Sequence, residues 1–184
     1  GNYQSPPQPI SGGYQQPPEN ILAVMRSLLP PVPVVSPTGR AALLVSWEEY
    51  PSIERVSTPF LRLAGVRVEP RNHSRHDTPA GYGIARCARQ LEIVRIADAS
   101  RTPVPLPANA CADTPVWSAD GKRFALALTT RDAVELWIGD GSTGSVRRVP
   151  DLRLNPMLGN TVSWMPDQQT LVVKAAPARL GPPP

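Results

Sequence analysis

One stretch of the chain decides its fold: Pro115-Val-Trp-Ser-Ala-Asp-Gly-Lys-Arg-Phe-Ala-Leu-Ala-Leu128. Strand-forming residues precede Asp120-Gly121, the dipeptide typical of a two-residue hairpin turn. Beyond the turn, Phe124, Leu126 and Leu128 alternate with alanines, with the period of two expected of a strand that has one buried face. The stretch therefore predicts a β-hairpin that packs through one face.

A second hairpin is predicted directly after the first. Its strands are Val134-Glu-Leu-Trp-Ile138 and Ser145-Val-Arg-Arg-Val149. Between them, Asp140-Gly-Ser-Thr-Gly144 lacks the Gly-Lys-Ser/Thr ending of a phosphate loop, so we interpret it as a turn. Four short strands within about 35 residues are typical of one β-propeller blade.

The blade-like unit recurs on both sides of this region. Downstream, Trp164-Met-Pro-Asp167 repeats Trp117-Ser-Ala-Asp120 at a spacing of 47 residues (167 − 120). Upstream, Val34-Val-Ser-Pro-Thr-Gly39 repeats Val116-Trp-Ser-Ala-Asp-Gly121 at a spacing of 82 residues (121 − 39). The upstream spacing fits two blades, or one blade that carries an insertion.

The second half of the unit decides between these alternatives. Leu91-Glu-Ile-Val-Arg-Ile-Ala-Asp98 resembles the strand that begins at Val134, with an offset of 43 residues between their glutamates (135 − 92). One half-blade at 32–47 and another at 84–107 therefore form a single blade, interrupted by an insertion at about 48–82.

We therefore predict an all-β fold, a partial β-propeller of about two and a half four-stranded antiparallel blades with a short N-terminal helix. The predicted division is a disordered Pro/Gln-rich arm (1–18), the helix and lead-in (19–31), blade one with the insertion at about 48–82 (32–107), blade two (115–150), the first hairpin of blade three (160–174), and a truncated loop (175–184). Because propellers close with about four to eight blades, we expect the chain to be the front part of a longer protein.

The predicted helix is short. Apolar residues recur at helical spacing between Glu19 and Leu29, and Pro30-Pro31 ends the run. We expect this helix to pack on the rim of the propeller.

Composition and charge favour no nucleic-acid or membrane partner. The net charge of +4 comes from 17 Arg and 2 Lys against 15 acidic residues, and the arginines are scattered rather than clustered. No run approaches the ~20 apolar residues that span a bilayer, and no signal peptide is seen. We predict no cofactor and no metal site.

The insertion is the least repetitive part of the chain. It predicts a strand at Phe60–Val68, followed by a mobile loop at Glu69–Gly83. His73 and His76 stand three residues apart in this loop, close to Asp77. A proline and a glycine nearby argue against the helix that would aim both imidazoles at one metal ion, so we interpret them as exposed loop histidines.

The chain has two cysteines, Cys87 and Cys111. Their spacing excludes a CxxC redox or zinc motif. Two alternatives stay open: a disulfide, which would fit an oxidising compartment, or two unrelated buried thiols.

Several motifs in succession resemble the N-terminal propeller of the prolyl oligopeptidase family of serine peptidases, in the branch of the bacterial and chloroplast glutamyl endopeptidases. The motifs are Val34-Val-Ser-Pro-Thr-Gly39, Pro51-Ser-Ile-Glu54, Leu61-Arg-Leu-Ala-Gly-Val-Arg-Val-Glu-Pro70, Trp117-Ser-Ala-Asp-Gly-Lys-Arg-Phe-Ala125, Glu135-Leu-Trp-Ile138, Asn155-Pro-Met-Leu-Gly159 and Trp164-Met-Pro-Asp167. The Leu61–Pro70 stretch, inside the insertion, is the most specific of these.

The resemblance implies a propeller followed by an α/β-hydrolase domain with a Ser, Asp, His triad. This chain contains no Gly-x-Ser-x-Gly elbow, so we expect no catalytic residue in it and no hydrolytic activity of its own. In the family the propeller filters substrates by size. A branch that cuts after glutamate needs a cation for that carboxylate, and we predict Arg67 and Arg71 as substrate-binding residues.

Two functional hypotheses follow. The first is a gating and substrate-binding part of a periplasmic or secreted serine endopeptidase, whose partners are a peptide or protein substrate and the C-terminal α/β-hydrolase domain of the same chain. The alternative is a non-catalytic β-propeller that acts as a protein-interaction scaffold, because a propeller fold does not fix its function.

Overall fold

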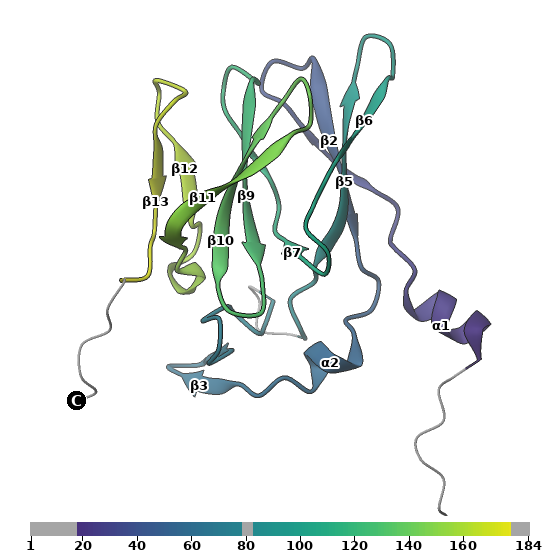
Figure 1. The fold of residues 1–184 in the computed structure, drawn as a ribbon, viewed down its shortest axis with the longest axis vertical. Coiled ribbons are helices and arrows are strands. Elements are labelled where there is room, and N and C mark those ends of the chain that lie inside the picture. Colours follow the sequence, from purple (N-terminus) through teal and green to yellow (C-terminus); the bar gives the residue numbers. More distant parts are fainter. Residues whose placement is uncertain (1–17, 79–82, 178–184) are drawn as a thin grey trace, which may run out of the picture.

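The computed structural model describes residues 18–78 and 83–177 (Figure 1). Strands dominate, and the short helices are α1 (Glu19–Met25), α2 (Ile53–Val56) and the 3₁₀ turn η1 (Pro156–Leu158). In the described ranges, no helix has the length and apolar character needed to cross a bilayer. Residues 1–17 of the predicted arm (1–18), 79–82 of the predicted mobile loop and 178–184 of the predicted truncated loop (175–184) lie outside the described residues.

The strands group into repeated antiparallel modules. The first module is β1 (Val32–Val35), β2 (Ala41–Trp47), β5 (Ala88–Arg95) and β6 (Arg101–Val104), hydrogen-bonded in that order. The second is β8 (Val116–Trp117), β9 (Arg123–Thr129), β10 (Val134–Asp140) and β11 (Val146–Arg153). A hairpin of β12 (Val162–Trp164) and β13 (Leu171–Val173) follows, and β7 (Cys111–Ala112) pairs with both β5 and β9.

Two tryptophans show that the modules are successive copies of one unit. The indole Nε1 of Trp117 donates a hydrogen bond to the carbonyl of Val34 at 2.8 Å, and that of Trp164 donates to Val116 at 2.9 Å. Val34 and Val116 are equivalent positions, each two residues before the serine of the first turn. Each tryptophan thus reaches the same point on the preceding module. The predicted all-β partial propeller of about two and a half blades is confirmed.

The strand of the opening stretch, β9, is buried on both faces, so the prediction of one buried face is wrong. Phe124 and Leu126 are fully buried in the cluster between the first two modules. The alternate residue Ala125 is only 1% exposed, because it packs with Leu136 and Val162 in the cluster between the second module and the third hairpin. A strand between two neighbouring blades has no solvent face, so residues of both parities are buried.

The helix α1 ends before the predicted apolar run does, and it is more exposed than predicted. It ends at Met25, and Leu28 and Leu29 pair instead with the end of β2, with the Leu29 N–H donating to the carbonyl of Trp47. Val24 is 62% exposed, so the apolar residues of the helix do not all pack on the rim.

The insertion between β2 and β5 contains a hairpin where a single strand was predicted. It consists of β3 (Leu61–Leu63) and β4 (Val66–Val68), which pair in antiparallel register. Ala64 and Gly65 have positive φ values of 48° and 84°, the combination that a tight two-residue hairpin turn requires. Gly65 adopts this conformation without strain because it has no Cβ, and it directly follows Ala64, the only alanine between Leu61 and Val68.

Candidate functional site

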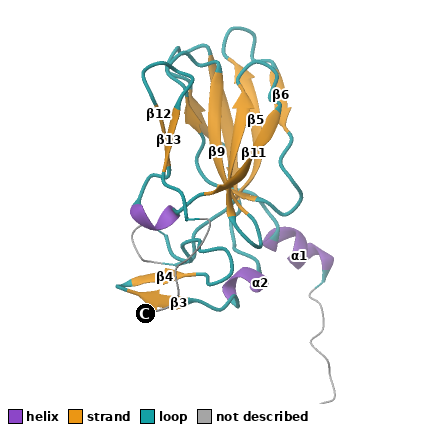
Figure 2. Cartoon of the chain, turned by 60° about the vertical axis from the view of Figure 1, so that its left-hand side comes forward, coloured by secondary structure: helices purple, strands orange, loops and turns teal. Residues whose placement is uncertain are grey.

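The insertion lies at one end of the two larger modules, where α2 and the β3–β4 hairpin sit together (Figure 2). Polar contacts fasten it there, and two clusters carry most of them. One cluster is centred on Glu48, at the end of β2, and the other on Glu69, just after β4.

Glu48 is a buried carboxylate that holds the base of the insertion. Its Oε2 accepts hydrogen bonds from Arg89 Nε at 3.1 Å and Nη2 at 2.9 Å, and its Oε1 accepts from the Cys87 N–H at 3.0 Å and from Arg55 of α2. Arg55 also donates to the carbonyl of Ala85. Burial lowers the pKa of Arg55, and the nearby Glu48 charge opposes this shift. A buried charge with this many donors is satisfied, so the cluster has a structural role.

A disulfide fixes the second end of the insertion. Cys87 precedes β5 and is bonded to Cys111 of β7, with an S–S distance of 2.01 Å. The sequence left open whether the two cysteines form a disulfide or are unrelated buried thiols, and the structure contains the disulfide. It joins the insertion to the short strand that connects the first two modules.

The Glu69 cluster contains the residues predicted to form a mobile loop. His76 is 2% exposed, and its Nδ1 lies 3.1 Å from Glu69 Oε1 while its ring stacks on Phe60 at 5.0 Å. Asn72 Nδ2 donates to the carbonyl of Thr130 at 3.0 Å, which ties the loop to the second module. His73 is exposed as predicted, but the prediction of an exposed His76 is wrong.

The burial of His76 follows from contacts that a local pattern cannot display. Phe60 and Glu69 flank it from different parts of the insertion. Residues 72, 74 and 76 are buried and alternate with exposed or half-buried ones, but all of them are polar, so the sequence carries no apolar alternation that could have indicated a packed segment. Within the described ranges, no group of three metal-ligating side chains gathers around it.

The two arginines proposed for substrate binding lie in this region, each paired with a carboxylate. Arg67 of β4 has its Nε 3.0 Å from Asp77 Oδ1 and lies over the Phe60 ring. The N–H is not aligned with that oxygen, so Asp77 Oδ1 stays buried without a hydrogen bond. Arg71 Nε donates to Asp132 Oδ1 at 2.7 Å on an exposed surface. Arg71 therefore contacts the second module, whereas the contacts of Arg67 lie within the insertion, and the structure does not bring the two arginines to one shared carboxylate.

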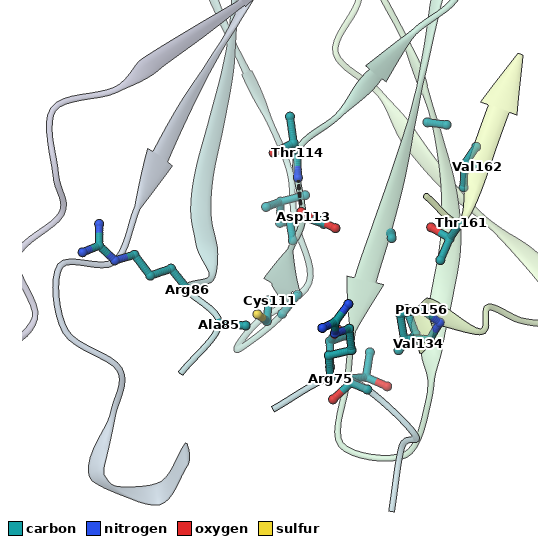
Figure 3. Close-up of a pocket in the computed structure, with 18 of the residues that line it drawn as sticks. Arg75, Ala85, Arg86, Cys111, Asp113, Thr114, Val134, Pro156, Thr161 and Val162 are labelled. Atoms are coloured by element: carbon teal, nitrogen blue, oxygen red, sulfur yellow. Dashed lines mark hydrogen bonds between the residues drawn. The ribbon is translucent and has the colours of Figure 1, made fainter. Parts of the chain in front are cut away.

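A large open cavity, about 2750 Å³, lies beside the insertion (Figure 3). We call it the inter-module cavity, and its lining includes Arg75, Ala85, Arg86, Cys111, Asp113, Thr114, Val134, Pro156, Thr161 and Val162. These residues come from the insertion, both modules and the third hairpin. Arg75 was not singled out from the sequence, and it projects into the cavity from the loop after β4.

These observations define the fold class of the chain, an open, propeller-like stack of antiparallel modules with one structured insertion. No protein-family model matches the chain. A solved structure described as "a putative dipeptidyl aminopeptidase IV from Bacteroides ovatus" resembles it with a TM-score of 0.46 and 16% identity, over 78% of this chain and 20% of that one.

Two curated plant proteins are similar to nearly the whole chain. The "Probable glutamyl endopeptidase, chloroplastic" of Oryza sativa subsp. japonica is 27% identical over 189 residues, 94% of this chain. The protein of the same description in Arabidopsis thaliana is 28% identical over 193 residues, 95% of this chain. The chain spans 19% of the length of each relative. The resemblance to glutamyl endopeptidases inferred from the sequence is thereby confirmed as a similarity over nearly the whole chain.

Proposed function

We propose that the chain forms the N-terminal propeller portion of a serine endopeptidase, where it gates access and helps to bind peptide substrate. The observation that carries the proposal is the similarity to two curated peptidases across 94% and 95% of the chain. Because the sequence lacks a Gly-x-Ser-x-Gly elbow, the nucleophile would come from an α/β-hydrolase domain of the same protein. The propeller would contribute a wall, an entrance and side chains that contact substrate.

The exposed apolar residues of the outer modules are consistent with further blades. Val32 and Ile96 are 50% and 52% exposed in the first module, and Val172 is 54% exposed in the third hairpin. Blades bury such faces against their neighbours, so these positions would be covered in a closed ring. An isolated piece of the chain would expose them and tend to aggregate.

Arg67 and Arg71 remain proposals as substrate contacts, and they differ in what binding would require. Arg71 and Asp132 form an exposed pair, and exchanging the Asp132 carboxylate for a ligand carboxylate would change the free energy little. Asp77 is 5% exposed, so drawing Arg67 away would leave a buried charge without a cation. Arg71 is therefore the better candidate of the two.

The Cys87–Cys111 disulfide supports a periplasmic or secreted location for the protein, because disulfides persist in oxidising compartments. The second candidate function, a non-catalytic interaction scaffold, keeps one observation in its favour: no nucleophile motif lies in this chain.

Labelling of the full-length gene product with a fluorophosphonate probe tests the proposal. We expect one serine to be labelled and short peptides to be cleaved, with a preference for glutamate over glutamine before the cut. Absence of both labelling and cleavage would favour the scaffold. Cleavage without a glutamate preference would keep the peptidase and remove the glutamyl specificity.

A further inference from the structure

Arg75 occupies a defined position at the wall of the inter-module cavity. An antiparallel bridge pairs it with Val68 of β4, and the Glu69 N–H donates to the carbonyl of Ser74 at 3.0 Å to close the intervening turn. Val68 and Ser74 are both buried. The backbone around Arg75 is therefore held in place, and its side chain extends into the cavity (Figure 3).

The guanidinium of Arg75 has unused hydrogen-bonding capacity. Its Nε is buried and has no hydrogen-bond partner, and no carboxylate of the described residues lies within 4.0 Å of its nitrogens. Leaving a buried N–H of a charged group without a hydrogen bond costs free energy, so the group is expected to have an acceptor. Water can serve as that acceptor, and so can an anionic ligand group.

Other arginines that line the same cavity differ from Arg75. Arg55 and Arg89 share Glu48, and Arg71 is paired with Asp132. Arg86 is exposed, and in Figure 3 its side chain points away from Arg75. Among the cavity arginines of the described segments, Arg75 alone is half-buried and forms no ion pair with a carboxylate.

The acidic residues that line the cavity are Glu54, Glu69, Asp77, Glu92 and Asp113, and among the described residues none of their carboxylates forms an ion pair with Arg75. Glu69 contacts His76 at 3.1 Å, and Glu92 contacts Arg101 at 3.4 Å. Asp77 has the Arg67 guanidinium as its counter-charge, at 3.0 Å. Asp113 Oδ1 accepts a hydrogen bond from the Thr114 N–H at 2.7 Å. None of these carboxylates therefore neutralises Arg75, and the cation is available to a group that enters from the cavity.

We propose that Arg75 is a specificity-determining residue that binds a carboxylate of a peptide in the inter-module cavity. The planar guanidinium presents paired N–H donors that match the two oxygens of a carboxylate, and an amide offers only one acceptor to this fork. The carboxylate could be a glutamate side chain or a peptide C-terminus. The proposal rests on the proposed function in assuming that the natural ligand is a peptide.

Fluorescence anisotropy on the full-length gene product, treated with a serine-directed sulfonyl fluoride, tests the proposal. Three labelled hexapeptides distinguish the sources of the carboxylate: one with an internal Glu and an amidated end, its Gln counterpart, and the Gln peptide with a free C-terminus. We expect one carboxylate peptide to bind about tenfold to a hundredfold more tightly than the amidated Gln peptide. We define the affinity ratio as the affinity for the carboxylate peptide divided by that for the amidated Gln peptide, and Arg75→Gln is expected to bring this ratio to about one.

Arg86→Gln is the matched control, because it removes the same charge from an exposed position on the same cavity. It is expected to change the ratio less than about threefold, as exposed charges are screened. Arg75→Lys keeps the positive charge but lacks the paired guanidinium donors, so it is expected to lower the affinity ratio in part. This variant tests the proposal if Arg75→Gln fails to fold. A ratio near one in the unaltered protein, or a ratio unchanged by Arg75→Gln or Arg75→Lys, would overturn the proposal.

The binding measurement also separates this proposal from the proposed function. If the full-length protein is not labelled by the fluorophosphonate probe and cleaves nothing, the peptidase is rejected while the anisotropy ratio still judges Arg75. If peptides are cleaved but the ratio is near one, the peptidase stands and the role of Arg75 is rejected.

Discussion

The two phenylalanines of the chain contrast its two regions. Phe124, in the repeated modules, is fully buried, forms an edge contact with Trp117 and lies directly over Gly139, where an added Cβ would meet its ring at 2.1 Å. Phe60, in the insertion, is 37% exposed and stacks on His76. The modules are held by apolar packing and the insertion by charges and rings. The stability of the stacked modules therefore depends little on the side chains at the surface of the insertion.

The largest expected effect comes from truncating Phe124. Phe124→Ala would leave a cavity between the first two modules and lower the free energy of unfolding by about 3–5 kcal/mol. Phe60→Ala, its counterpart in the insertion, would lower it by about 1 kcal/mol, since it removes one ring stack and one cation–π contact. Urea unfolding measures both. Equal losses would mean that the insertion is part of the main core.

The disulfide lies at the junction of the two regions and should give the next effect. Cys87→Ser with Cys111→Ser removes a cross-link that closes a segment of 24 residues, which corresponds to about 3 kcal/mol of chain entropy. We expect faster proteolysis within the insertion than within the modules, because the cross-link holds the end of the insertion. Uniform cleavage across both regions would contradict this ordering.

Removing the carboxylate of Glu48 should destabilise the insertion by a smaller amount. Glu48→Gln leaves Arg55 and Arg89 without a counter-charge, and we expect a loss of about 2–3 kcal/mol, since both arginines keep some solvent contact. The matched control is Glu92→Gln, which breaks the exposed pair with Arg101 and should change unfolding by less than about 0.5 kcal/mol. Similar values for the two variants, from urea unfolding, would refute a structural role for Glu48.

The modules could be predicted from the sequence because their signals are local. The Asp120-Gly121 turn, the alternation after it and its recurrence at Asp167 each fall within a few residues. The period of two indicated the strand correctly. It could not show that Ala125 is as buried as Phe124, because the second buried face is made by a neighbouring module.

The insertion could not be predicted to the same extent because its contacts are distant in sequence. Glu48 meets Arg89 across 41 residues, and Asn72 meets Thr130 across 58. The resemblance favours Arg67 and Arg71 only through their charge. Their pairing with carboxylates depends on how the chain folds back, and so does the lack of a partner at Arg75.

The repeated tryptophans allow the modules to be compared with each other. Trp117→Phe removes a donor from the buried carbonyl contact of Val34 and should lower the free energy of unfolding by about 1–2 kcal/mol. Trp164→Phe breaks the equivalent bond to Val116 at a more exposed position and should lower it by about 0.5–1 kcal/mol. Equilibrium unfolding in urea checks the order. A larger loss for Trp164→Phe would place the stronger junction at the third hairpin.

The smallest effect concerns the turn between β10 and β11. Hydrogen bonds from the Ser142 hydroxyl, and then from the N–H groups of Thr143 and Ser142, lower the pKa of Asp140 to about 2. The ionised form is favoured in the folded state, so its stabilisation is present above the ordinary Asp pKa of about 3.9 and is lost as pH falls toward about 2. Asp140→Asn should remove this part of the acid dependence.

The test is a comparison of unfolding between pH 4 and pH 2, with a carboxyl NMR titration of Asp140. Asp98 is the matched control, because the Ser100 hydroxyl and N–H lower its pKa in the equivalent turn of the first module. Its titration should be unaffected by Asp140→Asn. Because both side chains are exposed, the change in stability should be small beside those at Phe124 and Glu48. A normal pKa at Asp140 but not at Asp98 would show that the turns, unlike the tryptophan contacts, do not repeat between modules.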